Sequence, residues 1–260
     1  MVINMGFRFD YSDPNTVYPS QLRNPGNQLY FPSVDENGNI VTDSEGNIVL
    51  NEERMSTYLK AAPQKQISPR IGIAYQLGEA ALLRFSYGHF FQMPPYYALY
   101  DNNSFLVSPI DYDTKMGNPN IKAQKTIQYE VGFWQELNRN MTMEIALFYR
   151  DIYDLLGAKV ITTYNQISYG LYSNKDYGNV RGVELKYDYG MNDLHIGMNY
   201  TLQYTKGNAN NPSSTFDREG SQKDPIKRLI PMSWDQRHTA NLAVGYNREK
   251  YGITILGFYE

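Results

Sequence analysis

The sequence contains no cysteine, so a disulfide framework, a thiolate metal site and a thiol nucleophile are all excluded. It also lacks a basic excess, because 24 Lys and Arg stand against 27 Asp and Glu. That balance provides no basic surface of the kind that binds nucleic acid. No apolar run approaches the roughly 18 residues that a spanning helix needs. The sequence therefore predicts neither a nucleic-acid partner nor a transmembrane helix.

Tyrosine is the residue type that stands out among those present. There are 24 Tyr, compared with 11 Phe and 2 Trp. Tyr joins an apolar ring to a hydroxyl group, which suits the two interfaces between a membrane and water. The mean hydropathy of -0.55 is low. It is nevertheless compatible with a β-barrel, in which only alternate residues of each strand meet lipid.

Nine segments show the period-two alternation of strands with one apolar face. In the clearest, residues 194–205, every second side chain is apolar and those between are small or polar. This pattern places Ile145 and Met198 on the apolar face and Thr201 on the polar face. Phe148 is an exception, since it falls on the polar face of its segment. The polar face holds charged residues, among them Arg84, Glu130, Glu144, Glu184 and Lys186.

The connections between these segments alternate strictly between short and long. The short turns are expected at 78–80, 137–140, 190–193 and 247–250, and the long polar loops at about 12–66, 92–122, 155–177 and 207–235. An antiparallel sheet connected in this way has all its short turns at one end. This is the layout of an outer-membrane barrel, with short periplasmic turns and long extracellular loops. The predicted fold class is thus all-β, an antiparallel transmembrane barrel with strands of about 9–12 residues.

A short repeat lies inside the first long loop. The segment 35–41 (DENGNIV) is echoed by 43–49 (DSEGNIV), and each contains a turn-forming Gly between β-branched pairs. We therefore predict β-hairpins within this loop. A calcium loop is the alternative, since Asp35, Asn37 and Asn39 offer alternate oxygen ligands. However, Ile40 and Gly46 stand where an EF-hand loop has Gly and Glu.

Six stretches together resemble one family. They are VINMGFRFDYSDPN (2–15), SPRIGIAYQL with LLRFSYGHFFQMPPY (68–96), GNPNIKAQKTIQYEVGFWQEL (117–137), IALFYRDIYDLL (145–156), GNVRGVELKYDY (178–189) and SWDQRHTANLAVGY (233–246). In this order they resemble the C-terminal barrel region of TonB-dependent outer-membrane receptors, particularly those of Bacteroidetes-type bacteria. One departure is that Gln124 and Lys125 stand near a position where the family often has Glu.

The resemblance implies that residues 1–260 are a partial barrel domain, about nine strands of a barrel of about 22 strands. The plug domain and the N-terminal region that contacts the TonB–ExbB–ExbD complex are then expected outside this chain. The implied location is the bacterial outer membrane, where the barrel contacts lipid. The implied function is energised import of a scarce nutrient: a siderophore, cobalamin, glycan or peptide. A surface lipoprotein is a further partner that the resemblance suggests.

Two other classes of function remain open on the sequence. One is a passive porin-like or adhesin-like outer-membrane barrel, which would have no energised plug. The other is a soluble all-β module that binds carbohydrate, in which the polar face would meet solvent. The presence of an upstream plug domain would indicate a receptor instead of a passive barrel. Solubility only in detergent would exclude the soluble module.

No catalytic, metal or cofactor site is predicted. The three histidines, His89, His195 and His238, fall on different strands, whereas a shared metal needs them close together. The carboxylates of the polar face are not accompanied by a nucleophile or an oxyanion arrangement. The chain is accordingly not expected to be an enzyme.

The candidate ligand-binding stretch is 94–105 (PPYYALYDNNSF), in the second long loop. Its aromatic rings offer flat faces, while its carboxylate and amide groups can fix the orientation of a ligand. Such a combination suits sugars or aromatic metal chelates. Ordinary packing against neighbouring loops is the alternative. The residues predicted to contact the ligand are Tyr96, Tyr97, Tyr100, Asp101, Asn102 and Asn103.

Overall fold

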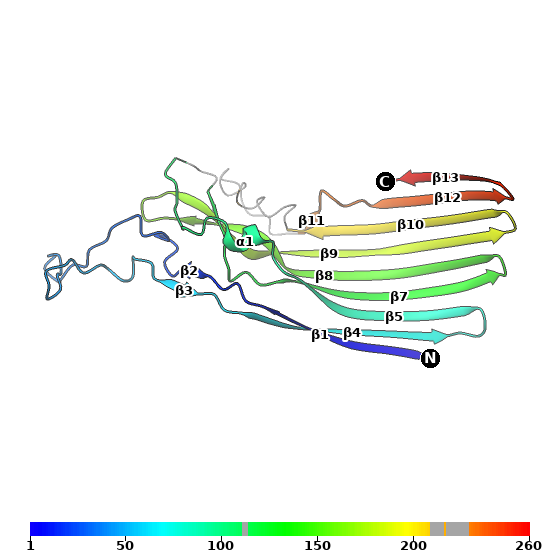
Figure 1. The fold of residues 1–260 in the computed structure, drawn as a ribbon, viewed down its shortest axis with the longest axis horizontal. Coiled ribbons are helices and arrows are strands. Elements are labelled where there is room, and N and C mark those ends of the chain that lie inside the picture. The colour runs from blue at the N-terminus through cyan, green and yellow to red at the C-terminus, as the bar shows by residue number, and fades with distance from the viewer. Residues whose placement is uncertain (111–113, 209–215, 217–228) are drawn as a thin grey trace.

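A single curved sheet of nine long antiparallel strands dominates the structure (Figure 1). The structure, a computed structural model, describes residues 1–110, 114–208, 216 and 229–260, without the side chains of Lys175 and Asp176. Each long strand pairs with the next one along the chain. The long strands are β1 (Val2–Ser12), β4 (Gln64–Gln76), β5 (Ala81–Gln92), β7 (Gln124–Asn138), β8 (Met141–Thr162), β9 (Ser168–Met191), β10 (Leu194–Gly207), β12 (His238–Arg248) and β13 (Tyr251–Tyr259).

Short elements lie at the end of the sheet that carries the long loops. They are β2 (Val17–Pro19), β3 (Tyr58–Lys60), α1 (Tyr96–Tyr100), β6 (Lys115–Met116) and β11 (Ile230–Pro231). β2 pairs with β3 in a separate two-stranded sheet, whereas β6 pairs with β9 and β11 with β10. No helix in the described part of the chain is long and apolar enough to cross a membrane.

The four predicted short turns are confirmed, and all lie at the end of the sheet away from the loops (Figure 1). Positive backbone φ angles at Gly78, Asn192 and Glu249 reverse the chain in three of them. The nine predicted strands and the all-β class are confirmed as well. The long loop predicted at 207–235 falls largely outside the described residues.

One predicted loop is wrong. The segment 155–177 was expected to be a loop, but β8 continues to Thr162 and β9 begins at Ser168. The hairpin therefore closes at 163–167, and its strands have 22 and 24 residues instead of the 9–12 expected. Side chains of both strand parities are buried here, Ala158 and Tyr172 in one cluster and Tyr169 and Leu171 in another, so the alternation that marks a strand with one apolar face is weak.

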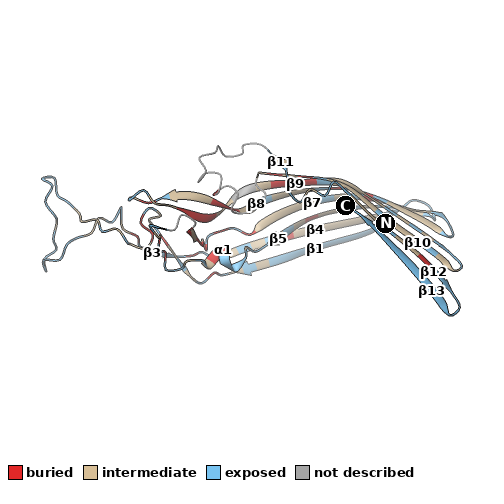
Figure 2. Ribbon diagram, turned by 90° about the horizontal axis from the view of Figure 1, so that it is seen from above, coloured by how far each residue is buried: buried red, intermediate tan, exposed pale blue. Residues whose placement is uncertain are grey.

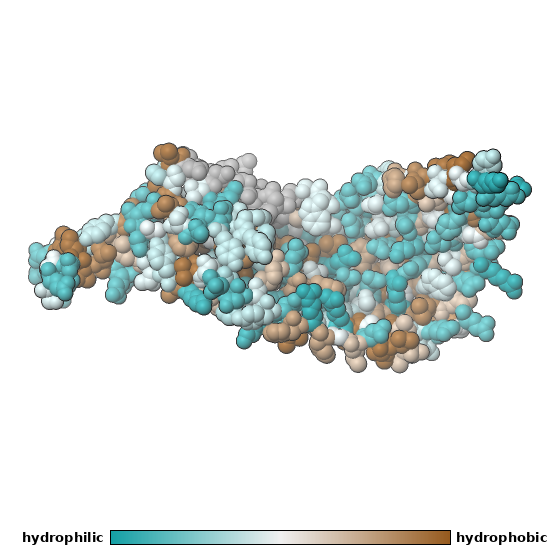
Figure 3. Space-filling model, in the orientation of Figure 1, coloured by the Kyte–Doolittle hydropathy of each residue, from teal (hydrophilic) through white to brown (hydrophobic). Residues whose placement is uncertain are grey.

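The sheet has one apolar and one polar face, as the alternation predicts. The edge strands β1 and β13 curve forward in Figure 2, so the face viewed in Figures 1 and 3 is concave. Figure 3 shows this concave face to be mainly hydrophilic over the strands. The convex face carries exposed apolar side chains such as Val131 and Leu147. The concave face is thus the lumen side of a barrel wall, and the convex face is the lipid side.

Tyrosines form a row across the convex face where the strands leave the apolar band. The register aligns Tyr87, Tyr129 and Tyr149, and their ring centroids are 5.1 and 6.4 Å apart in turn. Towards the short turns, Met141 of β8 pairs with Tyr189. Eight residues separate Tyr149 from Met141, about 26 Å along a strand. At a tilt of ~40° this gives a height of about 20 Å, near the ~25 Å band of outer-membrane barrels.

Phe148, the exception on the polar face, fills the space above a glycine. Its side chain is buried and lies opposite Gly182 of β9. A Cβ atom added to Gly182 would lie 2.6 Å from the Phe148 ring, so the ring covers the place of the absent side chain. The guanidinium carbon of Arg150 lies 4.9 Å from the centroid of that ring. Phe148 is therefore covered on the lumen side instead of facing water.

The two hairpins predicted in the first loop are present at its tip. Bridges join Val34 to Ile40 and Thr42 to Ile48, with positive φ at Gly38 and Gly46. In the first hairpin, the carboxylate of Asp35 accepts hydrogen bonds from the backbone of residues 37 and 39 and from the Asn39 side chain. Both carboxylate oxygens thus close the turn, which supports the hairpin interpretation over the calcium loop.

These turns are expected to loosen in acid. Hydrogen bonds from Asn39 hold the pKa of Asp35 below its ordinary value of 3.8, and those from Asn47 do the same for Asp43. A lowered folded-state pKa means that the contribution to stability is complete above 3.8 and is lost as pH falls through the folded value. We expect hydrogen-exchange protection of the turn amides at pH about 5, and its loss at pH about 2.5.

The variant Asp35→Asn provides an internal control, because it keeps one acceptor oxygen but cannot titrate. Protection in the first hairpin should then no longer depend on pH, while the second hairpin, closed by Asp43, should still open in acid. Equal protection of both hairpins at the two pH values in the unmodified chain would contradict the assignment.

Candidate functional site: the extracellular loop cluster

Three segments pack together at the loop end of the sheet, and we call them the loop cluster. They are residues 13–63, residues 93–110 with 114–123, and the β8–β9 extension from 155 to 174. Figures 1 and 2 place α1, which belongs to the second segment, on the concave side of the sheet. The second loop therefore folds inward, over the lumen side of the barrel wall.

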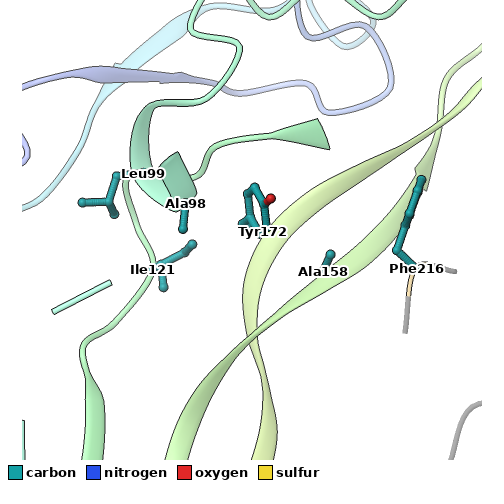
Figure 4. Close-up of a cluster of buried hydrophobic side chains, with 6 residues drawn as sticks. All are labelled: Ala98, Leu99, Ile121, Ala158, Tyr172 and Phe216. Carbon is teal, nitrogen blue, oxygen red and sulfur yellow. The ribbon is translucent and has the colours of Figure 1, made fainter. Parts of the chain in front are cut away.

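A small apolar core fixes α1 against the β8–β9 extension (Figure 4). Ala98 and Leu99 of α1 are buried there, and Ala98 and Ile121 lie beside the ring of Tyr172. Burial of these two side chains therefore sets the orientation of α1, a helix of only five residues. The full set of buried residues is Ala98, Leu99, Ile121, Ala158, Tyr172 and Phe216.

A second core joins the first loop to the same hairpin. Tyr169 of β9 is fully buried, and its hydroxyl donates a 2.7 Å hydrogen bond to the Leu22 carbonyl. Burial raises the pKa of Tyr169, so this hydroxyl stays a donor. The ring of Tyr58 stacks on Phe105 at 5.5 Å. The other buried members of this core are Val107, Met116 and Leu171.

Buried amides hold the base of the first loop in one conformation. The side chain of Asn24, 2% exposed, donates to the carbonyls of Leu29 and Arg54 and accepts from the Leu29 amide. The single hydroxyl proton of Ser56 is shared between the carbonyls of Gln21 and Asn24, at 2.9 and 3.0 Å. A buried network in which the partners satisfy one another makes a loop rigid. The cluster is thus a packed unit instead of a set of independent loops.

The Gly117-Asn118-Pro119 stretch, which the sequence predicts to lie in the second long loop, holds α1 in place. The Gly117 amide donates to the Asp101 carbonyl at 2.8 Å, and the Asn118 amide donates to the Ala98 carbonyl. The Asn118 side chain donates to the Tyr172 carbonyl at 3.0 Å. A Cβ at Gly117 would lie 2.6 Å from the Asp101 nitrogen. Only glycine allows the backbones to approach this closely.

The candidate tyrosines lie together on α1 and differ in exposure. Tyr96 is 80% exposed and Tyr97 50%, whereas Tyr100 is half-buried and donates to the Pro14 carbonyl. The centroids of Tyr96 and Tyr100 are 6.2 Å apart, and Tyr97 meets Tyr172 edge-on at 5.6 Å. Tyr96 and Tyr97 thus present open ring surfaces on α1, the helix that lies on the lumen side of the sheet.

The candidate polar residues follow α1 and have different surroundings. Asp101 and Asn103 are exposed. Asn102, with a positive φ, uses its side chain within the loop, donating to the Leu106 carbonyl at 2.7 Å and accepting from Ser104. The surfaces open to a ligand are consequently those of Tyr96, Tyr97, Asp101 and Asn103.

The charges of the lumen face pair with one another beneath the loop cluster. Arg84 forms a 3.3 Å ion pair with Glu130 and a second pair with Glu144. Lys186 lies directly opposite Glu144 on the neighbouring strand. Among the described residues, no group of three His, Asp or Glu side chains is placed to hold a metal ion. His89 and His238 instead contact the hydroxyls of Tyr87 and Tyr200.

The curved antiparallel sheet, with its apolar convex face, polar concave face and row of tyrosines, is the wall of an outer-membrane β-barrel. The family described as "TonB dependent receptor-like, beta-barrel" matches residues 2–259. The chain belongs to this family, whose members are β-barrels of the outer membrane of Gram-negative bacteria.

Solved structures agree with this fold. The copper transporter OprC is 12% identical with a TM-score of 0.50, and the match covers 98% of this chain and 32% of OprC. A double mutant of the Serratia marcescens hemophore receptor HasR, in complex with HasA and heme, is 13% identical with a TM-score of 0.54. That match covers 98% of this chain and 39% of HasR. The chain thus spans about a third of these receptors. No curated protein matches it.

Proposed function

We propose that residues 1–260 form part of the barrel of a receptor that binds a scarce nutrient at its extracellular loops. The receptor then imports the nutrient with energy from the TonB–ExbB–ExbD complex. The observation that supports this most directly is the inward fold of the second loop, which brings open aromatic and polar surfaces to the lumen side of the wall. A ligand held there lies over the path through the barrel.

A plug domain supplied by another part of the protein completes this proposal. The lumen wall carries paired charges, Arg84 with Glu130 and Glu144, that suit contact with a polar domain or with water. The chain covers about a third of the matched receptors, which leaves length for a plug and further strands. A surface lipoprotein is a further proposed partner at the loop end. Neither catalysis nor a bound cofactor enters this function.

Energy dependence separates this receptor from a passive porin. We expect cells producing the full-length protein to take up one labelled probe from a panel: a ferric catecholate, cyanocobalamin, a maltooligosaccharide and a peptide. That uptake should fall at least about tenfold when TonB is deleted or the proton gradient is collapsed, because the plug then stays closed. Uptake that persists in both conditions would favour the passive barrel instead.

The Tyr96 and Tyr97 rings can be tested with the probe whose uptake depends on TonB. Removing either ring, as Tyr96→Ala or Tyr97→Ala, is expected to weaken binding of that probe about tenfold, corresponding to ~1.4 kcal/mol. Tyr30, an exposed tyrosine of the first loop, provides the matched control, and Tyr30→Ala should leave binding unchanged. An equal effect of all three substitutions would show that α1 is not the contact surface.

A further inference from the structure

A pocket separate from the surface of α1 lies between the base of the first loop and the tip of the β8–β9 hairpin. Its volume is about 190 Å³. This is below the roughly 300–1,000 Å³ of pockets for drug-sized ligands, so it can hold a single ring but not a whole chelate. The side chains that carry the argument below are Arg23, Gln28, Leu29, Val107, Asn165 and Ile167.

Arg23 is the cationic residue that lines this pocket, and a second arginine, Arg54, lies near the same tyrosine ring. The guanidinium carbon of Arg23 lies 4.3 Å from the ring centroid of Tyr164, and that of Arg54 lies 5.6 Å from the same centroid. The ring of Phe31 meets Tyr164 edge-on at 5.1 Å. Stacking uses the flat face of a guanidinium and leaves its edge, where the N–H donors lie, open to a ligand. None of the residues that line the pocket is acidic.

The backbone holds Arg23 beside the hairpin, so the cation is not on a freely moving loop. The Tyr164 amide donates to the Arg23 carbonyl at 3.1 Å. The next residue, Asn24, is buried in the amide network at the base of the loop. The backbone at Arg23 is therefore held in place, and the stacking of its guanidinium on Tyr164 restricts the side chain before any ligand arrives, which lowers the entropy cost of binding.

Two amide side chains add hydrogen-bond donors. The Gln28 oxygen accepts a 2.7 Å bond from the Val107 amide, which leaves its NH₂ group as the free end. The Asn165 oxygen lies 2.6 Å from the Thr163 hydroxyl, whose single proton it shares with the Ile167 carbonyl at 2.8 Å, and the Asn165 NH₂ group is again the free end. Neither NH₂ group donates a hydrogen bond within the part of the chain that the structure describes. Both exposed ends are donors, and they complement an anion with several acceptor oxygens.

The remaining wall is apolar, formed by Leu29, Val107 and Ile167 together with Pro25 and Pro109. A ring can pack on this wall while a carboxylate meets Arg23 and the amide donors. We propose that the pocket binds a small ring-bearing carboxylate, with Arg23 as its main ionic contact. The proposal assigns a ligand class to the loops. Only the role of that ligand in import rests on the proposed function.

The test compares two carboxylates with their neutral counterparts. D-glucuronate is paired with D-glucose, and benzoate with benzyl alcohol, in calorimetric titrations of the full-length receptor in detergent. We expect at least one carboxylate to bind saturably and at least about tenfold more tightly than its counterpart. Its affinity should fall as salt is raised, because the contact is an exposed ion pair.

Two variants change the polar groups of the pocket. Arg23→Gln should lower the affinity for that carboxylate at least about tenfold. Asn165→Asp keeps the oxygen that accepts from Thr163 but adds a negative charge, so it should abolish the preference for the carboxylate. The matched control is Arg139→Gln, an exposed arginine in the turn between β7 and β8 at the opposite end of the sheet, which should bind like the unmodified protein.

Equal binding of carboxylates and neutral counterparts, or full affinity in both pocket variants, would overturn the inference. These failures are distinct from a failure of the proposed function. If uptake depends on TonB but the carboxylates show no preference, the pocket inference is wrong and the receptor stands. If the carboxylate preference is found while uptake continues without TonB, the pocket stands and active import is wrong.

Discussion

Replacing Ile145 with Arg is expected to block assembly of the barrel in the outer membrane. Ile145 lies on the convex face, midway between Tyr149 and Met141, which mark the two edges of the apolar band. A charge near the middle of that band costs about 2–4 kcal/mol. Met198→Arg should act in the same direction but more weakly, because Met198 pairs with Tyr187 nearer the short turns. The amount of heat-modifiable, protease-resistant barrel in outer-membrane fractions measures both effects.

Thr201→Arg is the control, since it places the same side chain on the opposite face. Thr201 lies opposite Glu184 on the lumen side, where an arginine meets an acidic neighbour and water. Near-normal assembly is expected for this variant. If Ile145→Arg, Met198→Arg and Thr201→Arg assemble equally well, the assignment of lipid and lumen faces is wrong.

The second large effect is expected from Gly117→Ala. The added Cβ would come within 2.6–2.8 Å of backbone atoms at the end of α1, and backbone cannot rotate away as a flexible side chain can. Overpacking of this kind costs about 1–3 kcal/mol. Because the strain is local, we expect α1 to leave its place while the barrel still assembles. Hydrogen exchange across 96–105 should accelerate about 5- to 150-fold, the equivalent of that cost.

The matched control for this prediction is Gly6→Ala in β1. A Cβ at Gly6 would meet no atom within 4 Å, so the same substitution adds no clash there. Gly117→Ala should also weaken binding of the probe whose uptake depends on TonB, whereas Gly6→Ala should leave that binding unchanged. Unchanged exchange in 96–105 after Gly117→Ala would show that the close approach of Gly117 does not hold α1.

The strand alternation was sufficient to predict the barrel wall, as the faces of β8 and β10 illustrate. Side chains in a strand point alternately to opposite sides, so the sequence itself separates Ile145 and Met198 from Thr201. The short turns follow from local backbone preferences at residues such as Gly78. Phe148 broke the pattern for a reason the strand alone does not contain: its ring covers Gly182 on the neighbouring strand.

The candidate site was predicted only in part. The aromatic stretch on α1 was recognisable from composition, but its inward position depends on Gly117, Asn118 and Tyr172. The Gly117-Asn118-Pro119 stretch was recognisable as family-like, but the sequence did not show that it holds α1 by hydrogen bonds. The cationic pocket had no sequence signal, because Arg23, Val107 and Asn165 are far apart in the chain.

By itself the sequence determined the class of fold, the number of long strands, their two faces and the end of the sheet that carries the loops. These properties depend on alternation and turn chemistry within a few residues. The tertiary structure alone decided the loop cluster, the length of the β8–β9 hairpin and the pocket beside Arg23. These depend on contacts between distant segments, such as the bond from Tyr169 to Leu22 across 147 residues, which no local pattern encodes.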